Sequence, residues 1–532
     1  MTLIHASTQA VGTRRWWETA VGYEVYLRSF ADGNGDGIGD FIGLTSRLDH
    51  LVDLGVDAVW VTPFYPSPQR DFGYDVADYC DVAPEYGTLA DFDAFTTRAH
   101  DLGLRVVIDL VPNHCSSDHP WFLEALADPS SEKRDWFIWK DPAPDGGPPN
   151  NWRAIFGGPA WEYEEVSGQF WMHLFLAEQP DLNWEHPGVR AAFRDILRFW
   201  LERGVDGFRV DVSHSLVKDQ SFADNPLKPG IDVPLEFGDF AAHLDIDQDG
   251  VFAVYEEWAP ILAEYDAFMI GETWVETERL WEYSREGRLH YSFWFGLMEL
   301  PWDPVVFAAE VRHAISTVPQ GHGWVTGSHD AHRAVTRFGG GEEGVERVLA
   351  LWVAMMGLPG VPFLYQGEEL GLENGHVAPE DVVDPVGRRT PEDGRDPCRT
   401  PMPWEPGTPQ AGFTTAEDAW LRSSPRSDAE TASVQRMAPG SALDRTRTLL
   451  RVRRDLGDRR LGPVDWQPAP EGTLVYRRGD VVHAANLLDE GVRVAVPEGG
   501  WTLRHTTNGG RLLDDGILLL PARSGAILER SR

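Results

Sequence analysis

The sequence predicts an α/β protein built on a (βα)₈ TIM barrel, and three observations lead to this prediction. A recurring unit joins an amphipathic helical stretch, usually closed by glycine, to a short and continuous apolar run. Polar side chains stand at the ends of these runs, where a barrel gathers its active site from many strands. No GxGxxG motif follows the first strand, which disfavours an open dinucleotide-binding sheet.

The repeated unit is clearest at four places. Gly55, Gly103 and Gly204 close helical stretches before VDAVWVTP, LRVVIDLVPNH and VDGFRVDVSH, and DAFMIGETW follows Glu264-Tyr265 without the glycine. Glycine is common just past a helix C-terminus, and a continuous apolar run is typical of a strand buried on both faces. These segments predict parallel strands that alternate with helices.

Two departures from the repeat predict further domains. After His114 a stretch rich in Pro, Gly and Trp runs to about Asn183, which indicates an insertion after the third strand. After a helix near Ser441 to Leu456 come short alternating segments such as TLVYRRG, VVHAANLL and GILLLPA, which indicate a small all-β sandwich. The expected domains are the barrel in two parts (1–113 and 183–457), the inserted domain B (114–182) and the C-terminal domain C (458–532).

The composition excludes several classes of partner. Among 532 residues, 47 are Lys or Arg and 84 are Asp or Glu, for a formal net charge of −37. Proteins that bind phosphate backbones rely on clustered Lys and Arg, so a nucleic-acid partner is not expected. Neither an apolar run of membrane-spanning length nor a basic amphipathic segment is present, so no membrane partner is expected either. We expect a monomer or a small homo-oligomer.

The cysteines and the first residues predict a cytoplasmic location. Cys80, Cys115 and Cys398 are odd in number and far apart, so they offer no disulfide framework and no CxxC pair. Met1 to Trp17 contains no apolar segment of useful length and no small-residue cleavage pattern.

Two acidic residues carry the prediction of function. Asp211 and Glu272 each follow a nearly apolar strand, where an unpaired buried carboxylate would be costly. Two carboxylates across a barrel mouth suit glycoside hydrolysis, one as nucleophile and one as general acid/base, and a separation of about 5 Å gives retention of configuration. The alternative is a structural ion pair of Asp211 with Arg209. Further polar groups at the presumed mouth, suited to holding sugar hydroxyls, favour catalysis: His114, Arg209, His329 and Asp330.

Ordered motifs along nearly the whole chain resemble the α-amylase superfamily, glycoside hydrolase family thirteen, and within it the α-glucosidase and oligo-1,6-glucosidase branch. They are YEVYLRSFADGNGDGIGD, DFGYDVADY, DLVPNH, EQPDLNW, GFRVDVSH, MIGETW, SHDAHRAVTRFG, GVPFLYQGEELG and GRDPCRTPMPW. Gln179 to Trp184, QPDLNW, is similar to the oligo-1,6-glucosidase type of the family's fifth motif.

The resemblance implies a role for each matching residue. Asp211 matches the nucleophile, Glu272 the acid/base and Asp330 a third carboxylate that stabilises and distorts the sugar. The implied binding residues are Arg209, which orients Asp211; Tyr74, stacked under the sugar; His114 and His329, on its hydroxyls; and Asp75 with Arg395 or Arg399, which recognise a non-reducing-end glucose and close the pocket.

Aromatic residues are frequent in the insertion, and most are expected to form its own core. Phe156 and Phe175 are expected to line the aglycone side instead, because aromatic faces stack on sugar rings. The remaining histidines near these motifs are assigned no role: His119, His173, His214 and His332.

Two residues depart from the family pattern or leave it ambiguous. Ser328 stands where the family usually has Asn, which leaves Asp330 in place but affects how its loop is held. Val212 follows the nucleophile, and valine there accompanies α-1,6 cleavage in parts of the branch and α-1,4 cleavage elsewhere. The linkage preference stays open.

A glycine-rich segment predicts a metal site. In DGNGDGIGD the oxygen ligands recur at every second residue, as in the first half of an EF-hand loop. The alternative is a turn whose acids are merely solvated, and the resemblance favours a structural Ca²⁺, or Mg²⁺, with no metal needed for catalysis. The expected ligands are Asp32, Asn34, Asp36, Ile38 (through its carbonyl) and Asp40.

Together these features predict an exo-acting, retaining α-glucosidase that releases glucose from the non-reducing end of short α-glucosides of the maltose or isomaltose type. A closed pocket would accept one glucose and whatever is linked to it. A second hypothesis delivers the same covalent intermediate to a sugar hydroxyl, as in a glucosyl-transferring or a sucrose- or trehalose-isomerising enzyme. A third, a catalytically silent binding subunit, is disfavoured because all three carboxylates are present.

Overall fold

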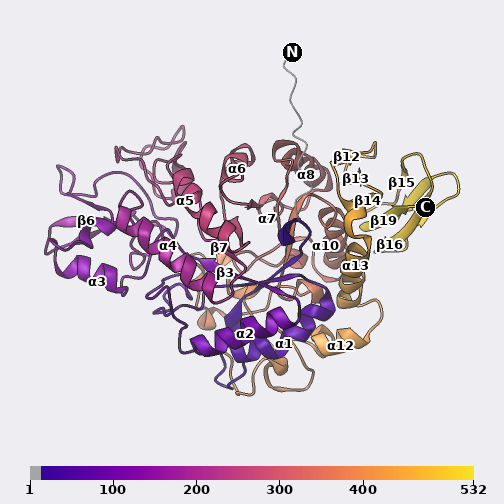
Figure 1. The fold of residues 1–532 in the computed structure, drawn as a ribbon, viewed down its shortest axis with the longest axis horizontal. Coiled ribbons are helices and arrows are strands. Elements are labelled where there is room, and N and C mark those ends of the chain that lie inside the picture. Colours follow the sequence, from indigo (N-terminus) through magenta and orange to yellow (C-terminus); the bar gives the residue numbers. More distant parts are fainter. Residues whose placement is uncertain (1–13, 532) are drawn as a thin grey trace, which may run out of the picture.

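Eight parallel strands close into a barrel at the centre of the molecule in the computed structural model, which describes residues 14–531 (Figure 1). Neighbouring strands follow the order β1-β11-β10-β9-β8-β7-β3-β2. This barrel confirms the predicted fold class. The strands are β1 (Gly22–Val25), β2 (Ala58–Val61), β3 (Arg105–Leu110), β7 (Gly207–Val210), β8 (Phe268–Gly271), β9 (Tyr291–Trp294), β10 (His322–Trp324) and β11 (Gly360–Tyr365).

Helices connect and cover the strands. Gly55, Gly103 and Gly204, which the sequence places after helical stretches, have φ angles of 100°, 81° and 91°, the left-handed region that glycine adopts without strain. The longer helices are α1 (Phe41–Leu54), α2 (Leu89–Asp101), α4 (Pro187–Glu202), α5 (Val251–Glu264), α6 (Thr277–Tyr283), α8 (Pro304–Thr317), α10 (Gly341–Met355) and α13 (Ala442–Leu456). Shorter ones are α7 (Gly296–Glu299), α9 (Ala334–Arg337), α11 (Pro385–Arg389) and α12 (Ala432–Met437).

The alternation of side chains along the strands produces two apolar layers. Phe208 and Val210 of β7 belong to the large core between the strands and the helices. A second cluster includes Trp60, Ile270 and Phe293, from β2, β8 and β9. Since successive side chains of a strand point to opposite faces, Arg209 points into the barrel rather than toward the helices.

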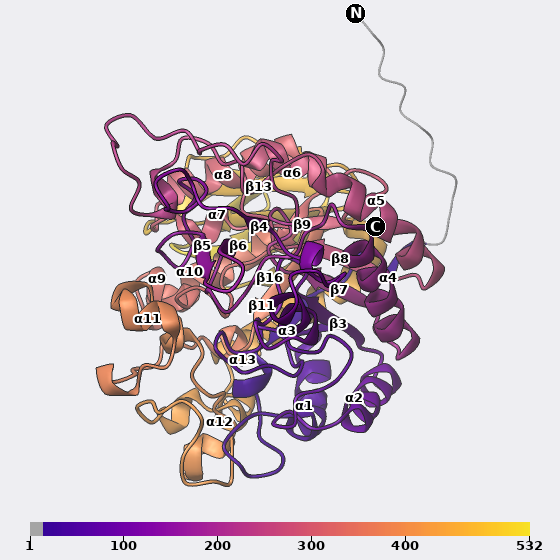
Figure 2. The ribbon, with the colours of Figure 1, turned by 90° about the vertical axis from the view of Figure 1, so that its left-hand side faces the viewer.

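The insertion forms a small sheet of its own between β3 and β7. It contains α3 (Pro120–Ala127) and the three strands β4 (Trp139–Lys140), β5 (Trp161–Glu164) and β6 (Gln169–Met172), in the order β4-β6-β5. Seen from this end of the molecule, the sheet lies in front of the barrel strands (Figure 2). The insertion is therefore placed to form one wall of a site at the barrel mouth.

The C-terminal part is all-β and lies at the opposite end of the molecule from the insertion (Figure 1). One sheet has the order β12-β13-β14-β19-β16 and the other β15-β18-β17, and β14 and β19 pack against α10. The strands are β12 (Asp465–Trp466), β13 (Thr473–Arg478), β14 (Val481–Asn486), β15 (Val492–Ala495), β16 (Trp501–Thr506), β17 (Arg511–Leu512), β18 (Ile517–Leu520) and β19 (Ser524–Arg530).

Two expectations concern location. Within residues 14–531, none of the helices has the length and apolar character that a membrane crossing requires. The expectation that residues 1–17 hold no export signal falls mostly on residues 1–13, which lie outside the described part of the chain. Cys80, Cys115 and Cys398 are all free thiols.

Candidate active site

Three acidic side chains and one arginine meet at the C-terminal ends of neighbouring strands. Asp109 of β3 lies beside Arg209 of β7 in the parallel register, and Asp211 and Glu272 directly follow β7 and β8. All four residues are buried. Because the carboxyl ends of parallel strands share one edge of the barrel, residues far apart in the sequence converge here.

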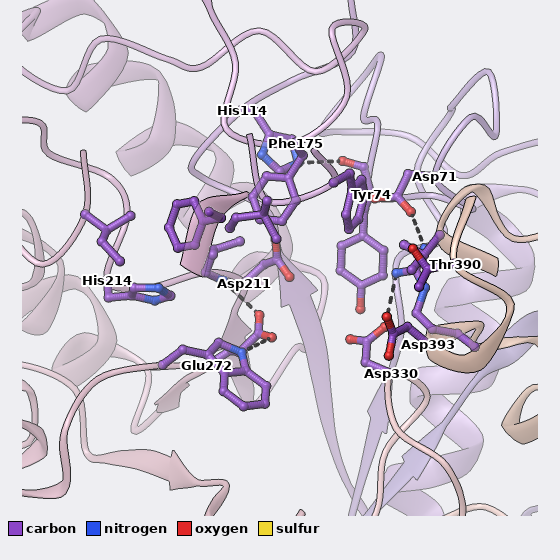
Figure 3. Close-up of a pocket in the computed structure, with 18 of the residues that line it drawn as sticks. Asp71, Tyr74, His114, Phe175, Asp211, His214, Glu272, Asp330, Thr390 and Asp393 are labelled. Atoms are coloured by element: carbon purple, nitrogen blue, oxygen red, sulfur yellow. Dashed lines mark hydrogen bonds and ion pairs between the residues drawn. The ribbon is translucent and has the colours of Figure 1, made fainter. Parts of the chain in front are cut away.

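Arg209 binds all three carboxylates. Its Nη1 lies 2.7 Å from Asp109 Oδ1 and 2.6 Å from Asp211 Oδ1, and its Nη2 lies 2.9 Å from Glu272 Oε2. The ion pair of Asp211 with Arg209 therefore exists, and the same guanidinium also holds Glu272. Both predicted catalytic carboxylates face one pocket, with Asp330 across from them (Figure 3).

Burial sets the protonation of this cluster. It raises the pKa of Asp211 well above its usual range, and the nearby charges of Glu272 and Asp109 add to this, while Arg209 opposes it. Burial also raises the pKa of Asp109 to about 6, although the positive charge of Arg209 acts to lower it. Carboxyls that interact this closely titrate together rather than singly. The raised pKa values of Asp211 and Asp109 favour retention of a proton within this cluster, where general acid catalysis needs one.

Asp330, the third predicted carboxylate, lies between two arginines. Arg399 Nη2 is 2.7 Å and Arg395 Nη1 is 3.3 Å from Asp330 Oδ1, and His329 Nε2 is 3.2 Å from Oδ2. Burial disfavours the charge of Asp330, but His329, Arg395 and Arg399 outweigh it and hold the pKa of this carboxyl below its usual range. Asp330 is therefore ionised, and it can accept hydrogen bonds from sugar hydroxyls.

His329 and Tyr74 form one rigid unit with a residue that the sequence analysis missed. The two rings stack with centroids 5.5 Å apart, and Tyr74 Oη lies 2.7 Å from His329 Nε2. On its other side, His329 Nδ1 lies 2.5 Å from Oε1 of the buried Glu24 in β1. Burial lowers the pKa of His329 to about 3, so its ring is neutral at pH 7. Glu24, an acid in an otherwise apolar strand, carried the same signal as Asp211.

The prediction that Asp75 pairs with an arginine is wrong, because Asp71 does so. Arg395 Nη2 lies 2.9 Å from Asp71 Oδ1, and Asp71 lines the pocket. Asp75 instead accepts hydrogen bonds from Ser67 Oγ (2.8 Å) and from the backbone N–H groups of Arg70 (2.9 Å) and Asp71 (3.0 Å). It thereby shapes the turn that aims Asp71 into the pocket. Of the two arginines offered, Arg395 makes this pair.

His114 is linked to Asp71 through the side chain of Gln179. Gln179 Nε2 lies 3.2 Å from Asp71 Oδ2 and 3.1 Å from His114 Nε2. Burial lowers the pKa of His114, so the ring is neutral and offers one donor and one acceptor. The sequence predicts no role for Gln179 beyond its place in the QPDLNW motif.

These residues line one cavity of about 450 Å³, a volume typical of small-molecule sites. The predicted Phe156 and Phe175 both line it, with ring centroids 5.3 Å apart. In Figure 3, Asp71, Asp330, Thr390 and Asp393 lie on one side of Asp211 and Glu272, and His214 lies on the other. The full lining is Asp71, Tyr74, His114, Ile155, Phe156, Phe175, Asp211, Val212, His214, Phe237, Ile246, Glu272, Trp274, Asp330, Val386, Arg389, Thr390, Asp393 and Arg395.

Three residues beside the carboxylates hold them in place. Val212, at a φ of 41° that a β-branched residue rarely adopts, donates its N–H to Glu272 Oε2 at 3.0 Å. Trp274 Nε1 donates to Glu272 Oε1 at 2.9 Å. Ser328 Oγ accepts the backbone N–H of Asp330 at 3.1 Å, so this serine caps the loop that carries Asp330. The sequence drew attention to Val212 and Ser328 but not to Trp274.

In the loop from Asp32 to Asp40, aspartate side chains accept hydrogen bonds from backbone N–H groups of the same loop. Asp32 Oδ1 accepts the N–H groups of Asn34 (3.0 Å) and Gly35 (2.6 Å), and Asp36 Oδ1 accepts that of Ile38 (2.9 Å). Asp40 caps α1 and also accepts the N–H of Asn34. Across residues 14–531, no group of three or more His, Cys, Asp or Glu side chains is arranged to hold a metal. The expected ligands also include the side-chain amide of Asn34 and the backbone carbonyl of Ile38, which do not belong to these four residue types. The metal site therefore stays a prediction.

Residues 24–457 match the family described as the alpha-amylase catalytic domain. A probable alpha-glucosidase of Rhizobium meliloti is 41% identical over 463 residues, which cover 83% of each chain. An oligo-1,6-glucosidase of Heyndrickxia coagulans is 34% identical over 533 residues, which cover 92% of this chain and 95% of the other.

Two solved structures extend the comparison to the fold. The alpha-glucosyl transfer enzyme XgtA is 38% identical, with a TM-score of 0.90 over 97% of this chain and 100% of the other. The trehalulose synthase MutB of Pseudomonas mesoacidophila MX-45 is 30% identical, with a TM-score of 0.87 over 98% and 100%.

Proposed function

The chain belongs to the alpha-amylase family of glycoside hydrolases, and from this premise we propose that it is an exo-acting, retaining α-glucosidase. Its substrates are short α-glucosides of the maltose or isomaltose type, from which it releases the non-reducing-end glucose. The observation that carries the proposal is the pair of carboxylates, Asp211 and Glu272, held by one guanidinium at a pocket that Asp71 and Arg395 line.

In the first step Asp211 Oδ attacks the anomeric carbon as the glycosidic C–O bond breaks. Glu272 gives its proton to the leaving oxygen, so the aglycone departs as a neutral alcohol and a glucosyl ester remains on Asp211. Arg209 supports this step because it fixes both carboxylates and counters their charge. The N–H groups of Val212 and Trp274 hold the glutamate in position.

In the second step Glu272 removes a proton from water, and the water oxygen attacks the same carbon as the bond to Asp211 breaks. Two inversions give net retention, so the product is α-glucose. Asp330 hydrogen-bonds the sugar hydroxyls and stabilises the oxocarbenium-like transition state by its negative charge. Its two arginines keep it ionised through both steps.

The pocket supports exo-action because it is closed beyond the non-reducing end. Asp71, Arg395 and Asp384 form a continuous ion-pair chain there, with Arg395 Nη2 2.7 Å from Asp384 Oδ1. The guanidinium of Arg389 lies against Gly157 of the insertion, where any larger residue would collide with it. A chain that continued past the first glucose would meet these groups.

A transferring enzyme is the second candidate, because XgtA and MutB, described as a glucosyl transfer enzyme and a trehalulose synthase, share the fold over nearly the whole chain. The chemistry differs only in the second step, where a sugar hydroxyl replaces water. Glu272 would deprotonate that hydroxyl in the same way.

The segment from Asp32 to Asp40 supports a structural Ca²⁺, with Mg²⁺ as the alternative ion. The side-chain oxygens of Asp32, Asn34, Asp36 and Asp40 and the carbonyl of Ile38 would hold it, and it would tie the loop before α1 together. The catalytic residues belong to other strands, so the ion supplies no chemistry. A cytoplasmic location and a monomeric or small oligomeric state stay predictions.

The experiment is a panel of maltose, isomaltose, sucrose and trehalose, followed by NMR of the anomeric protons during the first minutes. The proposal predicts glucose that appears first as the α-anomer from at least one of the two glucobioses. Initial β-glucose, or no cleavage of any member by folded protein, would overturn it. Isomerised disaccharide in place of glucose would select the transferring candidate.

A further inference from the structure

A second cavity, of about 140 Å³, lies at the opposite end of the barrel from the active site. Thr19 precedes β1 and Gly55 precedes β2, so the cavity lies where the chain enters these two strands, and the C-terminal end of α13 completes it. In barrels of this kind catalysis takes place at the C-terminal face, whereas residues of the N-terminal face contribute to stability. A ligand in this cavity would therefore act on the fold and not on the sugar.

Three arginines of one short segment line this cavity. Arg453 and Arg454 lie in the last turn of α13, and Arg460 ends the 3₁₀ helix Gly457–Arg460 that follows it. Arg453 is 4% exposed and Arg460 is 3% exposed. Since burial of a charged group is costly unless an opposite charge accompanies it, two buried guanidinium groups in one place require counter-charges.

Backbone carbonyls meet these guanidinium groups only in part. Arg453 donates three hydrogen bonds, to the carbonyls of Met356 (3.0 Å), Thr19 (2.7 Å) and Ala20 (3.2 Å). Arg460 donates one, to the carbonyl of Thr19 at 3.1 Å, and its Nε has no partner in the described part of the chain. A guanidinium has five N–H groups, and carbonyl oxygens carry only partial charges, so both donors and positive charge are left over.

Two acids line the cavity, and both are already engaged. Asp57 accepts a backbone N–H at 2.9 Å and pairs with Arg454 at 3.5 Å. Asp458 is exposed and pairs with Arg14. The three arginines that line the cavity therefore outnumber its acids, and Arg14 adds to the positive charge. Residues 1–13 contain no Asp or Glu, so that stretch of sequence adds no negative side chain.

The pKa values of the buried arginines reflect the same imbalance. Burial, and then the charge of Arg460, lowers the pKa of Arg453, while Asp57 opposes this. Burial, and then the charge of Arg478, lowers the pKa of Arg460 to about 10. At Arg209, where carboxylates touch the guanidinium, the pKa is raised instead. The cluster at the N-terminal face thus lacks the close anions that the active-site arginine has.

We propose that this cavity binds one inorganic oxyanion of the phosphate type, held by Arg453, Arg454 and Arg460. Guanidinium groups match the oxygens of phosphate because their planar N–H groups bind two oxygens at once. A water molecule needs a cavity of only about 10–15 Å³, so this one has room for a small polyatomic anion. The anion neutralises the buried charges and ties the end of α13 to the start of β1. This site is separate from the proposed function and adds an anion-dependent stability to it.

The test is thermal unfolding of the full chain in phosphate-free buffer, with inorganic phosphate then added at constant ionic strength. An ion that binds only the folded state stabilises it by mass action, so the midpoint should rise along a single-site curve. The rise should be about 2–3 °C at a concentration about 100-fold above the Kd. Chloride at the same ionic strength should give no comparable rise, and titration calorimetry should find one phosphate per chain.

Three variants locate the site. Arg460→Gln removes a buried charge, so it should abolish the rise without lowering the phosphate-free midpoint. Arg454→Gln changes a side chain that is 56% exposed and should weaken phosphate binding about two- to fivefold. Arg451→Gln removes the same charge from an exposed position of α13 outside the cavity lining, and as the matched control it should keep the wild-type rise.

Three outcomes would overturn the inference: no saturable rise with phosphate, an equal response to chloride, or a rise of wild-type size in Arg460→Gln. If Arg460→Gln does not fold, the wild-type titration and Arg454→Gln decide the question. Because the readout is unfolding and not hydrolysis, failure of this inference leaves the proposed function standing, and failure of the proposed function leaves the anion site standing.

Discussion

Arg209 balances more negative charge than one guanidinium carries. Asp109, Asp211 and Glu272 all contact it inside the barrel, where burial of unpaired charge is expensive. The indole N–H of Trp60 is a further donor to this cluster, 2.9 Å from Asp109 Oδ2. At the scale of the residue, burial raises the pKa values of Asp211 and Asp109, which favours a proton on this cluster beside the bond that is to be broken.

The pair of Asp71 and Arg395 yields a prediction about substrate recognition. We propose that the carboxylate of Asp71 accepts a sugar hydroxyl beside Arg395, and Asp71→Asn would remove that charge; a charged hydrogen bond of this kind contributes about 1.5–3 kcal/mol. We expect kcat/KM for maltose to fall roughly 10- to 100-fold. Asp78→Asn, an exposed residue of the same segment, is the control. Full activity of Asp71→Asn would restore Asp75 as a candidate.

At the scale of the element, one end of a barrel strand carries a buried acid that the chemistry does not use. Glu368 opens the short 3₁₀ helix Glu368–Leu370 after β11. It accepts the hydroxyl of Thr326 at 2.8 Å and the N–H of Tyr365 at 3.0 Å. Burial nevertheless raises its pKa to about 7, against these bonds and the charges of two arginines.

The raised pKa of Glu368 predicts a pH-dependent stability. The folded chain binds this proton more tightly than the unfolded chain, so the contribution to stability is complete below pH 4.5 and is lost as the pH rises to about 7. The loss is on the order of 3 kcal/mol. Glu368→Gln stays neutral, so its thermal midpoint relative to wild type should increase from about pH 5 to about pH 8.

The control for Glu368→Gln is Glu392→Gln, which removes an exposed charge. Thermal unfolding followed by circular dichroism at the two pH values measures the difference. An offset between Glu368→Gln and wild type that is equal at both pH values would contradict the assignment.

The loop before α1 predicts a response to metal. Addition of Ca²⁺ to chelator-treated protein should raise the thermal midpoint, because an ion that binds only the folded loop stabilises it by mass action. Asp36→Asn keeps an oxygen that accepts the N–H of Ile38 but removes a charged ligand, so it should abolish the shift without lowering the metal-free midpoint. A shift of equal size in the variant would place the ion elsewhere.

At the scale of the whole molecule, the insertion and the 385–395 segment turn an open barrel mouth into a pocket. Residues from both line it, and Arg389 reaches Gly157 of the insertion. Domain architecture thus decides between cleavage at a chain end and cleavage within a chain. The −37 net charge plays no part in this choice, since only a few of the 84 acids lie at the site.

The closed pocket predicts strict exo-action. A maltooligosaccharide whose non-reducing-end glucose is blocked at O4 and O6 should not be cleaved, whereas the unblocked compound should release one glucose at a time. Chromatography of early products distinguishes the two. Internal fragments from the blocked compound would show that the pocket admits a chain in both directions.

Much of this architecture could be predicted because strand ends leave a signal in the sequence. Asp211 and Glu272 stand out as acids after apolar runs, and the same rule applies to Glu24 and Asp109, which are acids within otherwise apolar strands. The sequence does not show that Asp71 rather than Asp75 pairs with Arg395. The pairing depends on the turn, in which Asp75 accepts the backbone N–H groups of Arg70 and Asp71. The role of Trp274 could not be predicted either. Its indole N–H donates to Glu272, two residues earlier in the same motif, and the sequence does not show this contact.

The proposed mechanism requires that Asp211 becomes covalently glucosylated, and mass spectrometry can detect this adduct. The variant Glu272→Gln is mixed with α-glucosyl fluoride, whose leaving group needs no proton, so the ester forms but lacks a base to hydrolyse it. Mass spectrometry of the acid-quenched, digested protein should find one glucosyl group on the peptide that contains Asp211. A glucosyl group on another residue, or turnover to β-glucose with no adduct, would contradict the account.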